Sequence, residues 1–289
     1  MITNLTPLQQ RLTVGGIGTL ISLVIIFLSP IPAFKPFFTT IIAATICVAM
    51  WELYQIYRAK GLEPAVKVGL TFGALYAFAT AIATQYVSAV MLPELILLIS
   101  LLSCFFYYFS RGSSPLFNLS ATMFGIIYLA VPLGCIIRVA YFFSQNQLQD
   151  GRWWLFYLIA VTKMTDTGGF FIGKQFGKEK LAPHISPKKT WEGALGGLCA
   201  AIFASIAIKW IATAFFDANA FGMTWWQSIW LGIGIGIFAQ CGDLSESLLK
   251  RDGGVKDSNQ LPGLGGILDL VDSLVFSSPL VYIFLKVYY

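Results

Sequence analysis

The sequence predicts an all-α, polytopic integral membrane protein with about nine transmembrane helices, on the grounds of composition and long apolar runs. Hydrophobic residues make up 57% of the 289 residues, and charged residues only 11%. An ordinary soluble domain carries roughly 45–50% apolar and about 25% charged residues. One globular core could not bury this much apolar surface, so the chain is expected to lie in a bilayer.

The apolar runs give the predicted spans. A helix needs about 20 mostly apolar residues to cross the hydrocarbon, and fewer where other helices surround it. The predicted spans are 14–31, 37–56, 66–85, 87–109, 118–143, 153–173, 193–216, 226–242 and 267–287. The first run exceeds a signal-peptide core of about 7–15 residues, so we expect it to remain as a span.

The basic residues predict the orientation of the chain. Most of the 19 Lys and Arg residues lie in the connectors after the second, fourth, sixth and eighth spans. Cytoplasmic connectors of membrane proteins are enriched in these residues. This distribution predicts that the N-terminus faces out and the C-terminus faces the cytoplasm.

The acidic residues divide the chain into two predicted regions. Most of them lie between Asp166 and Asp272. Residues 1–150 are therefore expected to form a transmembrane scaffold that contacts lipid. Residues 151–289 are expected to form the catalytic region, with cytoplasmic loops at 174–192 and 243–268.

Several function classes are excluded by what the sequence lacks. The five Cys form no CxxC pair and His184 is the single histidine, which argues against a Cys/His zinc site. The net charge of +5 does not indicate nucleic-acid binding, because the basic residues are not interleaved with aromatics. P-loop, GxSxG and HExxH motifs are absent. Metal-assisted phosphoryl or nucleotidyl transfer needs none of them.

A first polar constellation begins with KMTDTGGFFIGKQFGK, from Lys163 to Lys178. An acid at the centre of a membrane helix costs about 2.5–3.5 kcal/mol, so Asp166 is expected to face a cavity or a partner. The alternative is an ion pair with Lys163, three residues earlier on the same face. Lys174 and Lys178 add positive charge after the span.

The piece SPKKTWEG follows, and it is typical of an anion site at the start of a helix. Backbone N–H groups at a helix N-terminus attract phosphate. The residues expected to shape this site are Ser186, Lys188, Lys189, Thr190 and Glu192. The alternative is a positively charged membrane anchor in which Thr190 only caps the helix.

The second constellation runs from Cys241 to Ser273. Asp243, Glu246 and Lys250 recur at helical spacing, and a Gly-rich loop ends directly in Asp269 and Asp272. Carboxylates beside lysines suit Mg²⁺ that carries a polyphosphate, because Mg²⁺ takes one or two protein carboxylates and completes its shell with phosphate oxygens and water. A solvated amphipathic loop is the alternative.

At these residues the chain resembles the phosphatidate cytidylyltransferases, also called CDP-diacylglycerol synthases. The resemblance is carried by TDTGGFFIGKQFGK, SPKKTWEG, GDLSES and SLLKRDGGVKDSNQLPGLGGILDLVDS, in the family's order. Three positions depart from the family pattern: Leu264 replaces the usual His, Leu270 the usual Arg and Asn259 the usual Gly.

The resemblance implies transfer of the cytidylyl group of CTP to phosphatidate, with Mg²⁺ and a potassium ion. It implies a bacterial-type inner membrane location with the active site on the cytoplasmic side, and a homodimer. The implied catalytic residues are Asp243, Asp269, Asp272 and Lys250. The implied metal ligands are Asp243, Asp269, Asp166 and Asp272. The implied substrate-binding residues are Ser186, Lys188, Lys189, Thr190, Glu192, Lys174, Lys178, Glu246, Arg251, Lys256, Asp257, Gly265 and Gly266.

Two other functions stay open from the sequence. An ion-coupled membrane transporter could use Asp166, Asp243 and Asp269 as a cation path. Because of Leu264 and Leu270, a catalytically silent member of the family is the second alternative. A CDP-alcohol phosphotransferase is disfavoured, since its DGxxAR motif is absent.

Overall fold

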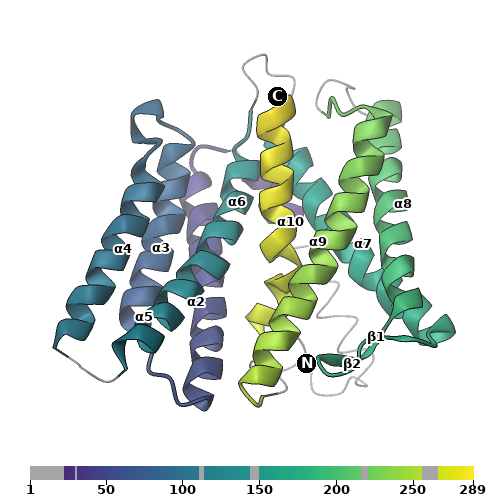
Figure 1. The fold of residues 1–289 in the computed structure, drawn as a ribbon. Helices are drawn as coiled ribbons and strands as arrows, with labels where there is room; N and C mark the ends of the chain where they lie inside the picture. Colours follow the sequence, from purple (N-terminus) through teal and green to yellow (C-terminus); the bar gives the residue numbers. More distant parts are fainter. Residues whose placement is uncertain (1–22, 30, 111–113, 144–149, 216–220, 256–265) are drawn as a thin grey trace, which may run out of the picture.

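The computed structural model is a bundle of long helices joined by short connectors (Figure 1). It describes residues 23–29, 31–110, 114–143, 150–215, 221–255 and 266–289. The helices are α2 (Lys35–Ala59), α3 (Val66–Ala83), α4 (Leu92–Phe109), α5 (Pro115–Gly125), α6 (Val131–Ala140), α7 (Gly151–Phe176), α8 (Trp191–Phe215), α9 (Trp225–Asp252) and α10 (Ile267–Tyr288). A 3₁₀ turn, η1 (Val87–Ala89), precedes α4, and a π-helical segment, η2 (Ile126–Ala130), joins α5 to α6. The predicted all-α class is confirmed.

Among the described residues, seven helical segments are long and apolar enough to cross a membrane. They are Lys35–Ala59, Val66–Ala83, Val87–Phe109, Pro115–Ala140, Trp191–Phe215, Trp225–Asp252 and Ile267–Tyr288. The predicted span 14–31 lies largely outside the described residues. Helix α7 covers the predicted span 153–173 but is not one of the seven, and it carries Lys163 and Asp166 within its length. The count of nine stays a prediction.

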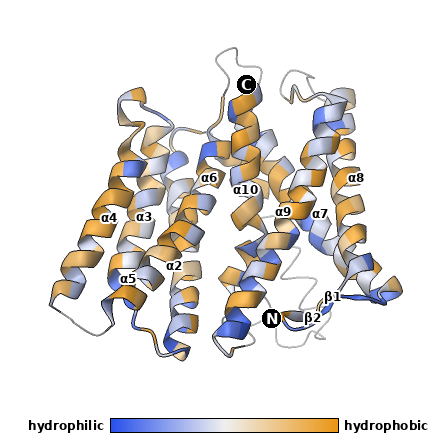
Figure 2. Cartoon of the chain, viewed as in Figure 1, coloured by the Kyte–Doolittle hydropathy of each residue, from blue (hydrophilic) through white to orange (hydrophobic). Residues whose placement is uncertain are grey.

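Apolar residues predominate along the helices (Figure 2), and many large apolar side chains are exposed, as expected of a protein that lies in lipid. Phe106 and Phe109 on α4 are 70% and 74% exposed, and Leu116 on α5 is 73% exposed. Soluble monomers rarely expose large contiguous apolar patches, so these side chains suit contact with acyl chains. Hydrophilic residues gather at the lower end of α9 and at the nearby hairpin in Figure 2.

Helix α10 lies between two groups of helices. Figure 1 shows α2–α6 on one side of α10 and α7–α9 on the other. Toward α6, the Ser278 hydroxyl donates to the Pro132 carbonyl at 2.8 Å. Toward α9, the backbones approach so closely that a Cβ at Gly242 would overlap the carbonyl oxygen of Asp272. The position of α10 therefore depends on both groups.

The first group is tied together by buried polar contacts near the α2–α3 turn. Tyr54 is fully buried, and its hydroxyl donates to the Thr122 carbonyl on α5 at 2.8 Å. The Thr122 hydroxyl in turn accepts from the Ala65 N–H at 2.8 Å, and the Asn118 side chain accepts from the Glu63 N–H at the same distance. These bonds satisfy backbone groups that would otherwise be buried without partners.

The predicted loops contain more regular structure than expected. In the predicted loop 174–192, α7 continues to Phe176, and β1 (Lys180–Ala182) and β2 (Ser186–Thr190) form an antiparallel hairpin. The prediction of a loop at 243–268 is wrong for residues 243–252, which belong to α9. Its charged residues pair within the helix and with α10, so the chain stays helical past the apolar stretch.

Candidate active site

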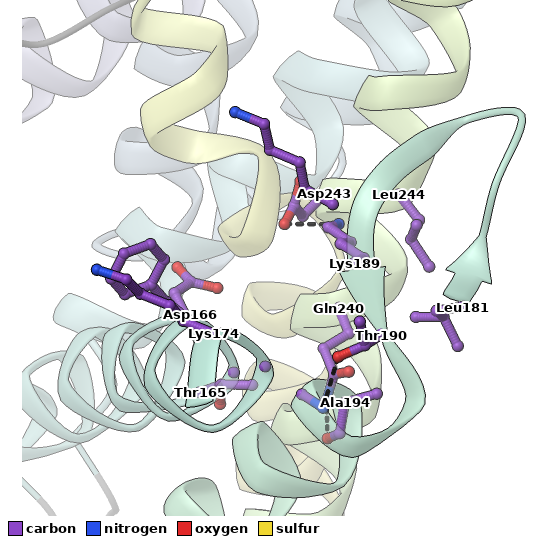
Figure 3. Close-up of a pocket in the computed structure, with 15 residues that line it drawn as sticks. Thr165, Asp166, Lys174, Leu181, Lys189, Thr190, Ala194, Gln240, Asp243 and Leu244 are labelled. Carbon is purple, nitrogen blue, oxygen red and sulfur yellow. Dashed lines mark hydrogen bonds and ion pairs between the residues drawn. The ribbon is translucent and has the colours of Figure 1, made fainter. Parts of the chain in front are cut away.

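A pocket of about 400 Å³ lies where α7, α8, α9 and β2 meet (Figure 3). This volume falls within the range of roughly 300–1,000 Å³ typical of small-molecule sites. The lining residues that the sequence predicted are Asp166, Lys174, Lys188, Lys189, Thr190 and Asp243. The other lining residues are Thr165, Gly169, Phe170, Gly173, Leu181, Gly193, Ala194, Gln240 and Leu244. Three lysines and two acids thus share one cavity.

Close packing of α7 against α8 shapes the floor of the pocket. A Cβ at Gly193 would lie 3.0 Å from the Gly169 carbonyl oxygen and 3.1 Å from the Gly173 Cα. Both contacts are tighter than nearly all real Cβ contacts, and both involve backbone atoms. A larger residue at 193 would therefore require the two helices to move apart by a few tenths of an ångström.

The hairpin holds two lysines over the pocket. Thr190 ends β2, and its hydroxyl accepts from the Gly193 N–H at 3.1 Å, so it caps α8. The Glu192 carboxylate accepts from the Lys178 N–H at 3.0 Å and also from the Glu179 N–H. These contacts tie the two ends of the hairpin together and fix β2, which carries Lys188 and Lys189.

Lys189 and Asp243 form the central charged contact of the pocket. The Lys189 ammonium lies 2.6 Å from a carboxylate oxygen of Asp243, and both side chains are partly exposed to the cavity (Figure 3). Asp243 is also close enough to Asp166, Glu246 and Asp272 for their like charges to repel. The site therefore places acidic side chains next to basic ones, and this arrangement favours a cation together with an anionic ligand.

Asp166 is joined to α10 through one hydroxyl. The Ser273 Oγ lies 3.2 Å and 3.3 Å from the two carboxylate oxygens of Asp166 and 3.0 Å from the nearest one of Asp272. The Lys163 ammonium lies 3.4 Å from Asp166, so the ion pair weighed as an alternative is present. The Lys163 ammonium also donates to the Leu270 carbonyl at 3.1 Å. Asp166 thus both pairs with Lys163 and lines the pocket.

The acids at the start of α10 belong to a second, more buried cluster. Lys250 is 6% exposed, lies 2.7 Å from Glu246 and forms an ion pair with Asp269. The other Asp269 oxygen accepts from the Gly266 N–H at 3.1 Å. Asp272 is buried and accepts from Ser273. Lys250 therefore pairs with both Glu246 and Asp269 between α9 and α10, and it is not among the residues that line the pocket.

The remaining predicted residues lie away from the pocket or outside the described residues. Ser186 begins β2, Lys178 is exposed, and the Arg251 guanidinium donates to the Ile185 carbonyl at 3.0 Å. None of these three lines the pocket as the structure describes it. Lys256, Asp257 and Gly265 fall outside the described residues.

Sequence reasoning missed Gln240, Ser273 and Glu52. The Gln240 amide donates to the Ala194 carbonyl at 3.1 Å and ties α9 to α8 at the pocket wall. Glu52 on α2 is fully buried and binds the first turn of α10. Each is a polar residue inside or beside an apolar span. Glu52, like Asp166, is an acid within a predicted apolar span, and the cost of an acid there indicates a polar partner.

The donor set fits a hard divalent cation. Among the described residues, no three His, Cys, Asp or Glu side chains are grouped closely enough to hold a metal alone. Mg²⁺ does not require such a group, because one or two carboxylates suffice when substrate phosphates supply further oxygens. Asp243 and Asp166, both in the pocket wall, are oxygen donors of this kind.

Comparison with known proteins identifies a family and relatives that align with nearly the whole chain. Residues 9–288 match the cytidylyltransferase family. A phosphatidate cytidylyltransferase of Chlamydia muridarum is 32% identical over 96% of this chain and 92% of its own length. Proteins of the same name from Synechocystis and Bacillus subtilis are 30% and 29% identical. These alignments cover 86% and 98% of this chain, and 88% and 100% of the relatives. The chain therefore belongs to the cytidylyltransferase family.

Proposed function

We propose that this protein is a phosphatidate cytidylyltransferase, which converts CTP and phosphatidate to CDP-diacylglycerol and pyrophosphate. Its family membership and its full-length relatives support this activity. The observation that carries the proposal is the pocket that joins Lys188 and Lys189 to Asp166 and Asp243. It offers basic side chains for a triphosphate and acidic ones for the cation that accompanies it.

In this mechanism, the basic residues hold CTP in the pocket. Lys188 and Lys189 on β2 and Lys174 on α7 bind the triphosphate. Asp243, which pairs with Lys189, would hold the accompanying cation. An oxygen of the lipid phosphate attacks the α-phosphorus of CTP. The bond from that phosphorus to the α–β bridging oxygen breaks, and pyrophosphate leaves. Alignment of the two phosphates in a fixed site supplies much of the rate.

We assign Mg²⁺ to Asp243 and Asp166, with Asp269 and Asp272 as the other predicted ligands. When bound, Mg²⁺ neutralises phosphate charge as the pyrophosphate leaves. Ser273 contacts both Asp166 and Asp272 and would keep these two carboxylates oriented. A potassium ion and a homodimer remain part of the proposal through the family resemblance.

We also propose that the active site lies on the cytoplasmic side of a membrane that the chain crosses nine times. The Lys and Arg distribution supports an outer N-terminus and a cytoplasmic C-terminus. Residues 151–289 carry the pocket, and residues 1–150 support it. A site at the cytoplasmic edge of the membrane lets the acyl chains of phosphatidate remain in lipid while CTP arrives from water.

A positive charge is present near Leu270. The Lys163 ammonium lies 3.1 Å from the Leu270 carbonyl, on the side of α10 that faces α7. Lys163 therefore places a cation beside the position where the family usually has Arg. This arrangement favours an active enzyme over a silent family member.

The activity is tested with the purified full-length protein in detergent, labelled CTP, phosphatidate and Mg²⁺. We expect labelled CDP-diacylglycerol to accumulate with equimolar pyrophosphate. No product in the presence of all three would indicate a silent member. Cation flux across proteoliposomes without product would indicate the transporter.

Replacing Lys189 tests the triphosphate site. Lys189→Gln removes a charge-assisted contact worth about 1.5–3 kcal/mol, so KM for CTP should rise about 10- to 100-fold. Steady-state kinetics at saturating phosphatidate measure this change. Lys180→Gln on β1, whose side chain is exposed outside the pocket lining, is the matched control and should leave KM within twofold. Equal effects of the two variants would remove Lys189 from the site.

A further inference from the structure

We propose that one stripe at the C-terminal end of α2, formed by Glu52, Ile56 and the C-cap residue Lys60, positions the acids of the active site. The stripe holds both the end of α9 and the start of α10. These three residues are spaced four apart, so they lie on one face of the helix. The proposal rests on the proposed function only in assigning Asp269 and Asp272 to the site. It makes α2 a positioning element, although it belongs to the predicted scaffold.

Glu52 supplies the strongest contact of the stripe. It is 0% exposed, and its two carboxylate oxygens accept from the Ile267 N–H at 3.1 Å and the Leu268 N–H at 2.8 Å. These are the first two N–H groups of α10, which no partner within the helix can satisfy. A carboxylate there is also favoured by the helix dipole. The residue that caps α10 thus lies on α2, more than 200 residues earlier.

Ile56 and Lys60 hold the other side, where α9 ends. A Cβ at Gly253 would overlap the Ile56 side chain, so the end of α9 packs directly on α2. Lys60 forms an ion pair with Asp252, and both side chains are about half exposed. Such an exposed pair contributes little, about 0–1 kcal/mol. The buried Glu52 contact is therefore expected to dominate.

The first turn of α10 connects the Glu52 contact to the active site. Asp269 lies in the first turn of α10, where it accepts from Gly266 and pairs with Lys250 of α9. One turn further, Ser273 bonds Asp166 in the pocket. The start of α10 is thus held between α2 and α9. A shift of this turn would move Asp269, Asp272 and Ser273 together relative to Asp243.

Two variants of the full-length protein test the proposal. Glu52→Gln keeps one acceptor oxygen but loses the charge and one hydrogen bond. Ile267→Pro removes an N–H that Glu52 binds while keeping a residue suited to the first helical position, and Ile267→Ala is its control. We expect kcat to fall about 10- to 100-fold in Glu52→Gln, with KM for CTP within twofold, because the acids are misplaced while the lysines of β2 are not.

A readout independent of catalysis accompanies the kinetics. Hydrogen exchange of residues 266–272 should become faster in Glu52→Gln and Ile267→Pro, but not in Ile267→Ala. The losses in the double variant should be less than additive, because both changes weaken the same contact between Glu52 and the start of α10. Glu94→Gln, an exposed acid in the first turn of α4, should change neither readout.

These outcomes separate the proposal from a general stability effect. Lower protein yield with normal kcat and normal exchange at 266–272 would overturn it, and so would additive losses in the double variant. If Glu52→Gln does not fold, the comparison of Ile267→Pro with Ile267→Ala still tests the contact. If the wild type makes no CDP-diacylglycerol, the exchange data alone decide the inference and the proposed function fails separately.

Discussion

Asp243→Asn should lower the rate of CDP-diacylglycerol formation by about 100- to 1,000-fold, the loss typical when a preorganised electrostatic contact to the transition state is removed. The change keeps the shape of the side chain but removes the charge that pairs with Lys189 and that is assigned to the cation. Substrate binding should suffer less than turnover, because Lys188 and Lys189 remain. Steady-state kinetics with labelled CTP measure both.

The control for Asp243→Asn is Glu179→Gln, immediately before β1. Glu179 is exposed and is not among the pocket-lining residues, so its variant should retain activity within twofold. A normal rate for Asp243→Asn would mean that the metal site lies elsewhere. Equal losses in both variants would point to a loss of folded protein.

Gly242→Ala should reduce turnover about 100-fold or more, because misplacement of catalytic groups by about 1 Å has effects of this size. The added Cβ would overlap the Asp272 carbonyl oxygen and lie 3.2 Å from the Ser273 Cα. These are backbone atoms that cannot rotate away, so α9 and α10 must separate. We also expect a loss of about 1–3 kcal/mol of stability, measured by thermal unfolding in the same detergent.

A second glycine of α9 provides a matched control. A Cβ at Gly234 would lie 2.9 Å from Leu280 Cδ2, the flexible end of a side chain. Gly234→Ala should therefore keep activity within threefold. If Gly242→Ala behaves like Gly234→Ala, the spacing of α9 and α10 does not set the geometry of the acids.

The sequence predicted the helical bundle well because hydropathy reports directly on burial in lipid. The spans predicted at 66–85 and 267–287 correspond to α3 and α10 within two residues at each end. It predicted the end of α9 poorly. The helix continues ten residues past the apolar run, because Glu246 and Lys250 are stabilised by partners on α10 and within α9. Hydropathy does not report such pairing.

For the site, residue type and order were enough to find the pocket's charged side chains, including Asp166, Lys189 and Asp243. They were not enough to separate the Lys189–Asp243 contact from the buried Lys250–Asp269 cluster. That separation depends on how β2, α9 and α10 pack in space. Glu52 was overlooked for the same reason, since its partners lie more than 200 residues later in the chain.

The central claim is that the pocket between α7, α8, α9 and β2 holds the triphosphate of CTP together with a divalent cation bound by Asp243. A structure of the protein with CTP and Mn²⁺ in place of Mg²⁺, with the manganese located by anomalous scattering, tests it most directly. We predict manganese on a carboxylate oxygen of Asp243 and phosphates along Lys188 and Lys189. A nucleotide bound outside this pocket, or manganese held without Asp243, would contradict the account.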